Sequence, residues 1–169
     1  SKEGVYYDFA RLLSKRSTQY VFRTQFLPRK RIDHLLKLQQ ISGGLIGVNP
    51  LWFGDKQEEK YLWGPSLFKD QDEMVSLSHY PFEYNGPESL SGERIGGVLG
   101  YYYFGIDELI KEKKAYRINS NGERAILFML LSGRVRAGVV SRSTFNYLVP
   151  REGWQGKFHL SKKPHDVYD

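Results

Sequence analysis

Strand-like and helix-like segments alternate along much of this chain, and their order constrains the fold more than any other feature. The short β-favouring segments lie at residues 74–77, 94–99, 115–118, 135–140 and 158–161. The intervening segments with helical apolar spacing lie at 106–113, 123–131 and 143–148. Such alternation is typical of a mostly parallel sheet with helices on its faces. We therefore expect an α/β fold.

The first third of the chain shows the same two patterns. Apolar spacing predicts a helix over residues 8–15, and alternation predicts a strand over residues 18–26. Pro28 opens a second helix, because proline suits the first helical position. Residues 45–48 are typical of a short buried strand.

The strand and helix pattern occurs twice, on either side of a loop rich in proline, glycine, serine and asparagine. This predicts two lobes, with residues 1–78 and 150–169 in the first and residues 93–149 in the second. Residues 79–92 would form the hinge or crossover. The cleft between two such lobes is the natural place for a ligand.

Composition narrows the class of function. Aromatic residues reach 15%, a density that supplies core volume and lines ligand clefts. The net charge of +6 is compatible with phosphate binding. The basic residues are scattered, however, so we expect a solvated surface and no nucleic-acid partner. A mildly cationic cleft for an anionic solute is the second interpretation.

The common catalytic, cofactor and metal motifs are absent. The chain has no cysteine, and its four histidines lack zinc-site spacing. Gly96-x-x-x-Gly100 is not a dinucleotide fingerprint, no phosphate loop occurs, and Ser141 lacks a nucleophile elbow. We therefore expect a protein that is not an enzyme and that holds no cofactor or metal.

Three short motifs occur in an order that resembles bacterial extracellular solute-binding protein family 3. They are Gly4-x-x-x-Asp8, Gly97-x-x-Gly100 and the Leu130–Ala137 segment that contains Gly-Arg-Val. The resemblance implies a two-lobed periplasmic-binding-protein type II fold, here without the family's first strand and last helix. It also implies a periplasmic monomer whose leader has been removed and which passes a small solute to a membrane transporter.

The positions of the family's ligand contacts are changed in this chain. The family's arginine clamp for an α-carboxylate would follow Asn49-Pro50, where Leu51 and Trp52 stand. Its serine or threonine after the turn glycine is Tyr101, and its aspartate falls near Ser141. Ordinary α-amino acids should therefore bind poorly, and a ligand with an apolar or aromatic part is favoured. The candidate ligand-binding residues are Trp52, Tyr101, Tyr102, Ser141, Arg29, Arg31 and Asn49.

Two alternatives remain within the same fold. The chain could be the ligand-sensing domain of a signalling receptor, which closes on its ligand in the same way. It could also be a small-molecule lyase or dehydratase, which would need a poised acid or base in the cleft. Glu83, Glu88 and Asp107 are available for that role, but no motif marks them.

Overall fold

The computed structural model describes residues 3–168 and divides into two compact units. The first unit ends at Leu62, and the second begins at Trp63. All the strands of the described chain lie in the second unit. Each unit is therefore described by itself.

The first unit consists of short helices and extended segments. Its helices are α1 (Val5–Arg16), α2 (Arg29–Lys37) and the 3-10 helix η1 (Pro50–Phe53). The predicted helices at 8–15 and after Pro28 are confirmed. The predicted strands at 18–26 and 45–48 are wrong: neither segment pairs with another strand among the described residues. The apolar side chains of 18–26, such as Val21, are exposed, so no buried face holds that segment in a sheet.

The second unit is built on one six-stranded sheet in the order β3-β2-β4-β1-β5, with β6 also paired to β1. The strands are β1 (Asp70–Leu77), β2 (Arg94–Val98), β3 (Tyr116–Ser120), β4 (Ala137–Ser141), β5 (Phe158–Leu160) and β6 (Asp166–Tyr168). β2 runs parallel to β3 and β4, whereas β1 is antiparallel to β4, β5 and β6. The sheet is mixed, which corrects the mostly parallel prediction. A helical crossover between two strands lets them run parallel, as in β2, β3 and β4. No such crossover follows β1, and β1 runs antiparallel to its neighbours.

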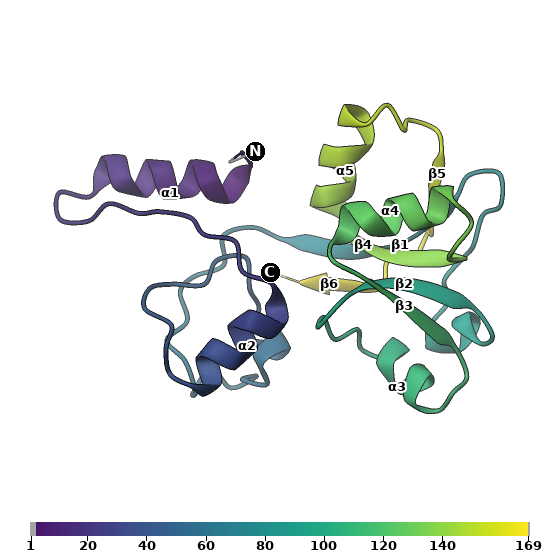
Figure 1. The fold of residues 1–169 in the computed structure, drawn as a ribbon, viewed down its shortest axis with the longest axis horizontal. Helices are drawn as coiled ribbons and strands as arrows, with labels where there is room; N and C mark the ends of the chain where they lie inside the picture. The colour runs from purple at the N-terminus through teal and green to yellow at the C-terminus, as the bar shows by residue number, and fades with distance from the viewer. Residues whose placement is uncertain (1–2, 169) are drawn as a thin grey trace. The chain divides into compact units, whose positions relative to one another are not determined.

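Helices cover both faces of this sheet, as Figure 1 shows. α3 (Ile106–Lys111) packs on one face, and α4 (Glu123–Leu131) and α5 (Arg142–Arg151) pack on the other. α4 lies very close to β4: a Cβ atom at Gly138 would stand 2.3 Å from Ile126 Cγ2. The helical and strand segments predicted for this part of the chain are confirmed, and β6 was not predicted.

The compact units differ from the predicted lobes. The residues of β1, β5 and β6 fall in the predicted first lobe, yet β1 pairs with β4 of the predicted second lobe and so joins all six strands in one sheet. The predicted hinge at 79–92 contains the 3-10 helix η2 (Pro87–Leu90). Tyr84 and Leu90 in this segment are buried in the core with α3. Its turn-rich composition therefore belongs to an anchored loop within one unit.

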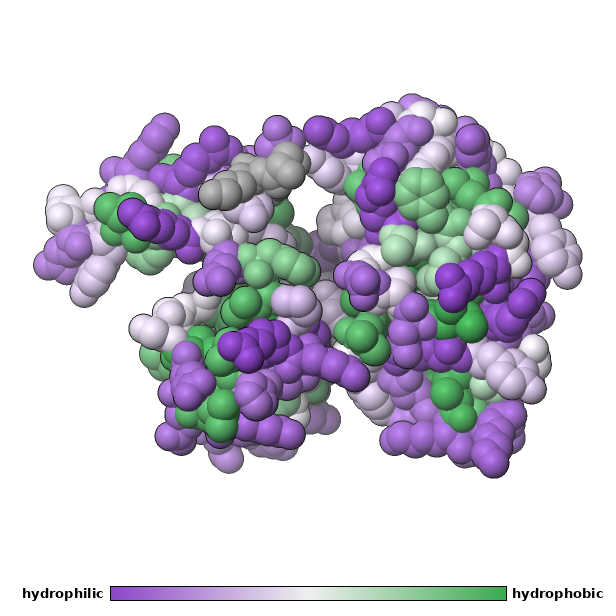
Figure 2. Space-filling model, in the orientation of Figure 1, coloured by the Kyte–Doolittle hydropathy of each residue, from purple (hydrophilic) through white to green (hydrophobic). Residues whose placement is uncertain are grey.

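The two units bury their apolar side chains to different degrees. Both cores of buried hydrophobic residues lie in the second unit. Among the described residues of the first unit, the buried ones are polar, Asn49 and Asp55. Hydrophobic side chains remain at the surface of both units (Figure 2). Within residues 3–168, no helix has the length and apolar character needed to cross a membrane.

Candidate functional site

A cavity of about 390 Å³ lies within the first unit, between α2 and the segment that begins at η1. Its lining combines aromatic rings with charged side chains: Arg29, Asp33, Leu36, Lys37, Trp52, Phe53, Lys60 and Tyr61. The predicted residues Arg29 and Trp52 are therefore brought together, although they are far apart in the sequence. This cavity is the candidate site of the first unit.

Arg29 is held in one orientation at the cavity wall. Its Nε donates a hydrogen bond to Asp33 Oδ1 at 2.8 Å, one turn further along α2. A terminal nitrogen donates to the carbonyl oxygen of Trp52, and the guanidinium lies 4.1 Å from the centre of the Phe53 ring. These contacts orient the charge before any ligand arrives, which lowers the entropic cost of binding.

Two buried polar residues fix the other wall of the cavity. The Asn49 side chain accepts a hydrogen bond from the backbone nitrogen of Leu51 at 2.9 Å and so caps η1. The Asp55 carboxylate accepts hydrogen bonds from the backbone nitrogens of Glu59, Lys60 and Tyr61 at 3.0, 2.9 and 3.1 Å. Asn49, predicted as a ligand contact, thus has a structural role in placing Trp52.

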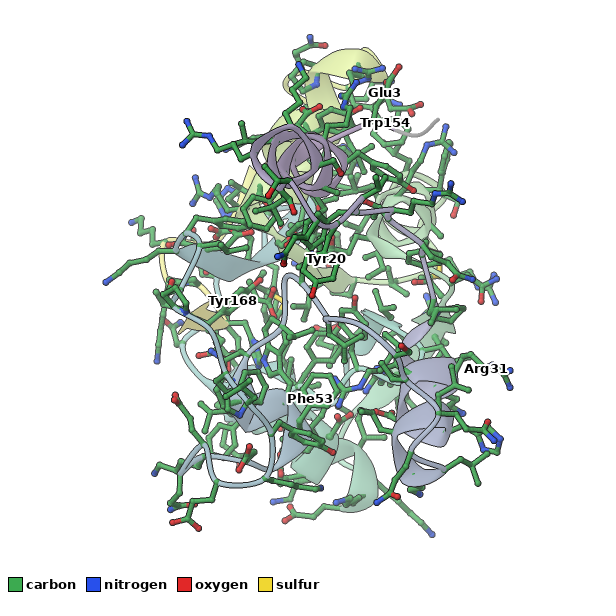
Figure 3. The ribbon with its side chains drawn as sticks, turned by 90° about the vertical axis from the view of Figure 1, so that its left-hand side faces the viewer. Glu3, Tyr20, Arg31, Phe53, Trp154 and Tyr168 are labelled. Carbon is green, nitrogen blue, oxygen red and sulfur yellow. The ribbon has the colours of Figure 1, made fainter. Side chains whose placement is uncertain are left out.

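Arg31 does not share the cavity of the first unit. It is exposed on α2, and Figure 3 shows its side chain pointing away from the side of the helix on which Phe53 lies. Residues two apart on a helix do not share a face, which explains why Arg29 and Arg31 differ.

A separate candidate site lies at the carboxyl ends of β2 and β4 in the second unit. Tyr101 and Tyr102 follow β2 and are exposed, whereas Tyr103 is buried. The Tyr102 hydroxyl donates a hydrogen bond to the Glu108 carboxylate, and this bond raises the pKa of Tyr102 to about 12. The Tyr103 hydroxyl accepts a hydrogen bond from the backbone nitrogen of Val98 at 3.0 Å. Tyr103 is therefore a structural residue of this turn.

Ser141 ends β4 and is buried in a hydrogen-bonded group. Its backbone nitrogen and its hydroxyl donate to the two carboxylate oxygens of Glu123, at 2.6 and 3.0 Å. Its hydroxyl oxygen also lies 2.8 Å from the Thr144 hydroxyl. The partners of Ser141 thus join β4 to the starts of α4 and α5.

Asp72 is a titratable group at this edge that the sequence analysis missed. It pairs with Ser141 across β1 and β4, and its Oδ1 accepts a hydrogen bond from the Tyr168 hydroxyl at 3.1 Å. Burial raises the pKa of Asp72 to about 7, assisted by the carboxylates of Glu123, Asp166 and Asp70. Tyr168 lies on β6, beside β1, as Figure 3 illustrates. The available signal was the pair of acids two residues apart, Asp70 and Asp72, which share one face of a strand.

A further cavity of about 300 Å³ opens at the opposite edge of the sheet, near the amino ends of β2 and β4. The Arg136 guanidinium there lies 3.6 Å from the centre of the Tyr80 ring and donates to the carbonyl oxygens of Tyr80 and Pro81. None of the predicted ligand-binding residues lines this cavity. No group of His, Cys, Asp or Glu suited to a metal ion occurs within the described part of the chain.

Comparison with known proteins identifies the fold. No protein-family model matches the sequence, and no curated protein does. Among solved structures, a glycine-to-alanine mutant of arginine-bound ArgBP from T. maritima matches 98% of this chain, with a TM-score of 0.71 and 15% identity. The chain therefore has a periplasmic-binding-protein fold. Holo ArgBP from the same source matches 95% of the chain, with a TM-score of 0.65 and 17% identity.

The chain spans only part of the length of the ArgBP and GluR0 structures. It covers 73% of the ArgBP mutant and 67% of holo ArgBP. It spans 43% of the GluR0 ligand-binding core solved with L-glutamate, where the TM-score is 0.47. At 15% and 17% identity, the two ArgBP matches show a shared fold. The α/β and type II periplasmic-binding predictions are thereby confirmed, and the matched ArgBP structures are of a binding protein.

Proposed function

We propose that this chain is a solute-binding protein that works with a membrane transporter outside the cytoplasm. The observation that carries the proposal is the oriented Arg29 guanidinium beside Trp52 in a cavity of the first unit. A fixed charge next to an aromatic wall suits recognition of a small solute. The resemblance in fold to arginine-bound ArgBP supports the same class of function.

The candidate ligand-binding residues lie in two groups, one in each unit, and each group is considered by itself. Arg29 and Trp52 supply contacts from the first unit, and Asn49 holds Trp52 in place. In the second unit, taken by itself, Tyr101 and Tyr102 supply exposed rings at the sheet edge, and the buried Ser141 hydroxyl is held by Glu123. We expect ordinary α-amino acids to bind weakly, because the family's arginine clamp is replaced near Trp52.

The test is a thermal-shift screen of the full chain against amino acids, organic acids and polyamines. A solute at 100 times its dissociation constant should add about 2.7 kcal/mol of stability. We expect a stabilising solute among the organic acids, and calorimetry then gives its affinity. The Trp52→Leu variant should lose most of that affinity. If no compound in the screen stabilises the chain, the proposed function is wrong.

A lyase or dehydratase is the second candidate function, and Asp72 is the observation in its favour. A carboxyl group with a pKa of about 7 is suited to general acid–base catalysis at neutral pH. The solute found in the screen would be incubated with the protein and followed by NMR. Conversion of the solute, abolished in Asp72→Asn, would replace the binding proposal by the enzymatic one.

A further inference from the structure

We propose that α1 and the extended residues 17–26 that follow it form a surface that binds an anionic lipid membrane. We call residues 5–26 the amphipathic segment. The segment lies within the first unit, and the inference goes beyond the proposed function because it does not depend on a solute. Three observations carry it: the charge of the segment, its exposed apolar side chains, and the contacts that hold it together.

The excess positive charge of the chain lies at its start, although basic residues occur throughout. Residues 1–31 hold eight lysines or arginines and two acids, whereas residues 32–169 hold seventeen of each. The acid Asp8 is already paired with Arg11. Lys15, Arg16 and Arg23 are exposed and form no ion pair among residues 3–168. Cations gathered in one segment are attracted to a surface that is itself negatively charged.

Large apolar side chains of the same segment are exposed to water. Val5 and Leu12 lie two turns apart on α1, so they share a face of the helix. In the extended residues after the helix, Val21 and Phe26 are 79% and 75% exposed. Insertion of such side chains at the boundary between headgroups and acyl chains would remove this apolar area from water.

Hydrogen bonds hold the extended residues against α1. The Ser14 hydroxyl accepts a hydrogen bond from the backbone nitrogen of Phe22 at 2.7 Å, and the Ser17 hydroxyl accepts one from that of Tyr20 at 2.9 Å. The Tyr20 and Phe22 rings meet edge to face, with centroids 6.4 Å apart. Figure 1 shows the chain turning back alongside α1, and Figure 2 shows apolar and hydrophilic side chains next to one another there. The cations and the apolar side chains therefore belong to one folded surface.

This combination favours a lipid surface over the other partners of a basic segment. A nucleic acid would pair with the cations and leave aliphatic side chains such as Val5, Leu12 and Val21 in water. A second copy of the segment would bring like charges together, which opposes association. An anionic membrane offers negative headgroups to the cations and an apolar layer beneath them.

The test measures co-sedimentation of the full chain with lipid vesicles. Equal amounts of phosphatidylcholine and phosphatidylglycerol provide the anionic surface, and pure phosphatidylcholine provides the neutral one. We expect at least about tenfold tighter binding to the anionic vesicles, with an affinity that falls as the salt concentration rises. Equal binding to the two kinds of vesicle, or binding to neither, would overturn the proposal.

Charge variants locate the binding on the amphipathic segment. The triple variant Lys15→Gln, Arg16→Gln, Arg23→Gln should weaken binding at least about thirtyfold, because each cation near an anionic leaflet contributes roughly a factor of five. The matched control makes the same change to glutamine at three exposed lysines of the second unit, Lys111, Lys157 and Lys162. It lowers the net charge equally and should weaken binding less than about threefold. Equal losses in the two triple variants would overturn the proposal.

Apolar variants test whether side chains enter the lipid. Val21→Ser combined with Phe26→Ser should weaken binding about tenfold or more, because both side chains would otherwise leave water. The matched control, Val167→Ser combined with Phe104→Ser, changes the same residue types at exposed positions of the second unit and should leave the affinity unchanged. Equal losses in the two pairs, or no loss in the first, would overturn the proposal.

A fluorescent label reports insertion directly, because the chain has no cysteine of its own. An environment-sensitive dye on Val21→Cys should shift to the blue with anionic vesicles, whereas the dye on Gln155→Cys, at an exposed position of the second unit, should not. The same response at both positions would contradict the proposal. Tighter binding to duplex DNA at the same salt concentration would replace it with a nucleic-acid partner. A dimer that Val21→Ser with Phe26→Ser abolishes would replace it with a second copy.

Discussion

At the scale of single residues, Asp72 makes stability depend on pH. Its pKa is raised from 3.8 to about 7 in the folded chain, so the folded state holds a proton that the unfolded state releases. The stabilising effect of that proton is fully present below about pH 4 and is lost as the pH rises to about 7. We expect the advantage of Asp72→Asn over the parent chain to grow by about 2–4 kcal/mol between pH 4.5 and 7.5. Urea unfolding at several pH values measures this difference, and a constant difference between the two chains would contradict it.

Tyr102 and Tyr103 are neighbours in the sequence, but only the buried Tyr103 should contribute to stability. Tyr103→Phe removes a buried acceptor and leaves the backbone nitrogen of Val98 unpaired, so it should cost about 1–3 kcal/mol of unfolding free energy. Tyr102→Phe is the control, since Tyr102 is exposed and its loss should cost less than about 0.5 kcal/mol. Both values come from denaturant unfolding. Equal costs in the two variants would show that the Tyr103 bond does not stabilise the turn.

At the scale of elements, the distance between α4 and the sheet depends on glycine. Gly138→Ala would bring a methyl group to 2.3 Å from Ile126 Cγ2, which forces the helix or the side chain to move. Such overpacking should lower the free energy of unfolding by about 1–3 kcal/mol. Gly64→Ala is the control, because no atom lies within 4 Å of its added Cβ. The proposed close packing would be contradicted if both variants unfolded at the same denaturant concentration.

Sequence patterns predicted some of the helices and strands and missed others. α4 was predicted over residues 123–131 because it carries a complete apolar face and packs on the sheet. β1 was predicted only from Met74, because its first residues are polar and their strand pairing is supplied by β6. β6 has three residues, too few for a periodic signal. Residues 18–26 had the strand pattern but have no partner strand among the described residues, and a strand requires one.

The sequence indicated single candidate residues, but it did not indicate which distant residues the fold brings next to them. Arg29 was a candidate from the sequence, but its partners, Asp33 and the carbonyl oxygen of Trp52, are known only from the structure. The grouping of Lys60 and Tyr61 with Arg29 depends on Asp55, which folds the intervening loop. The raised pKa of Asp72 depends first on its burial in the folded chain and then on the carboxylates of Glu123 and Asp166, which lie far from it in the sequence.

At the scale of the whole molecule, stability is concentrated in the second unit. All members of the two buried clusters lie in it, and its sheet supplies the backbone hydrogen bonds that buried strands need. The described residues of the first unit bury no hydrophobic side chain, so little apolar burial opposes the conformational entropy of those residues.

We therefore predict that residues 63–169, expressed alone, fold and unfold cooperatively, whereas residues 1–62 alone do not. Thermal unfolding followed by circular dichroism should give a sigmoidal transition for the first fragment and a gradual slope for the second. Amide proton NMR should show dispersed signals for residues 63–169 only. A cooperative transition in residues 1–62 would mean that their extended segments make a core of their own. A disordered 63–169 fragment would mean that its two clusters are insufficient without the preceding residues.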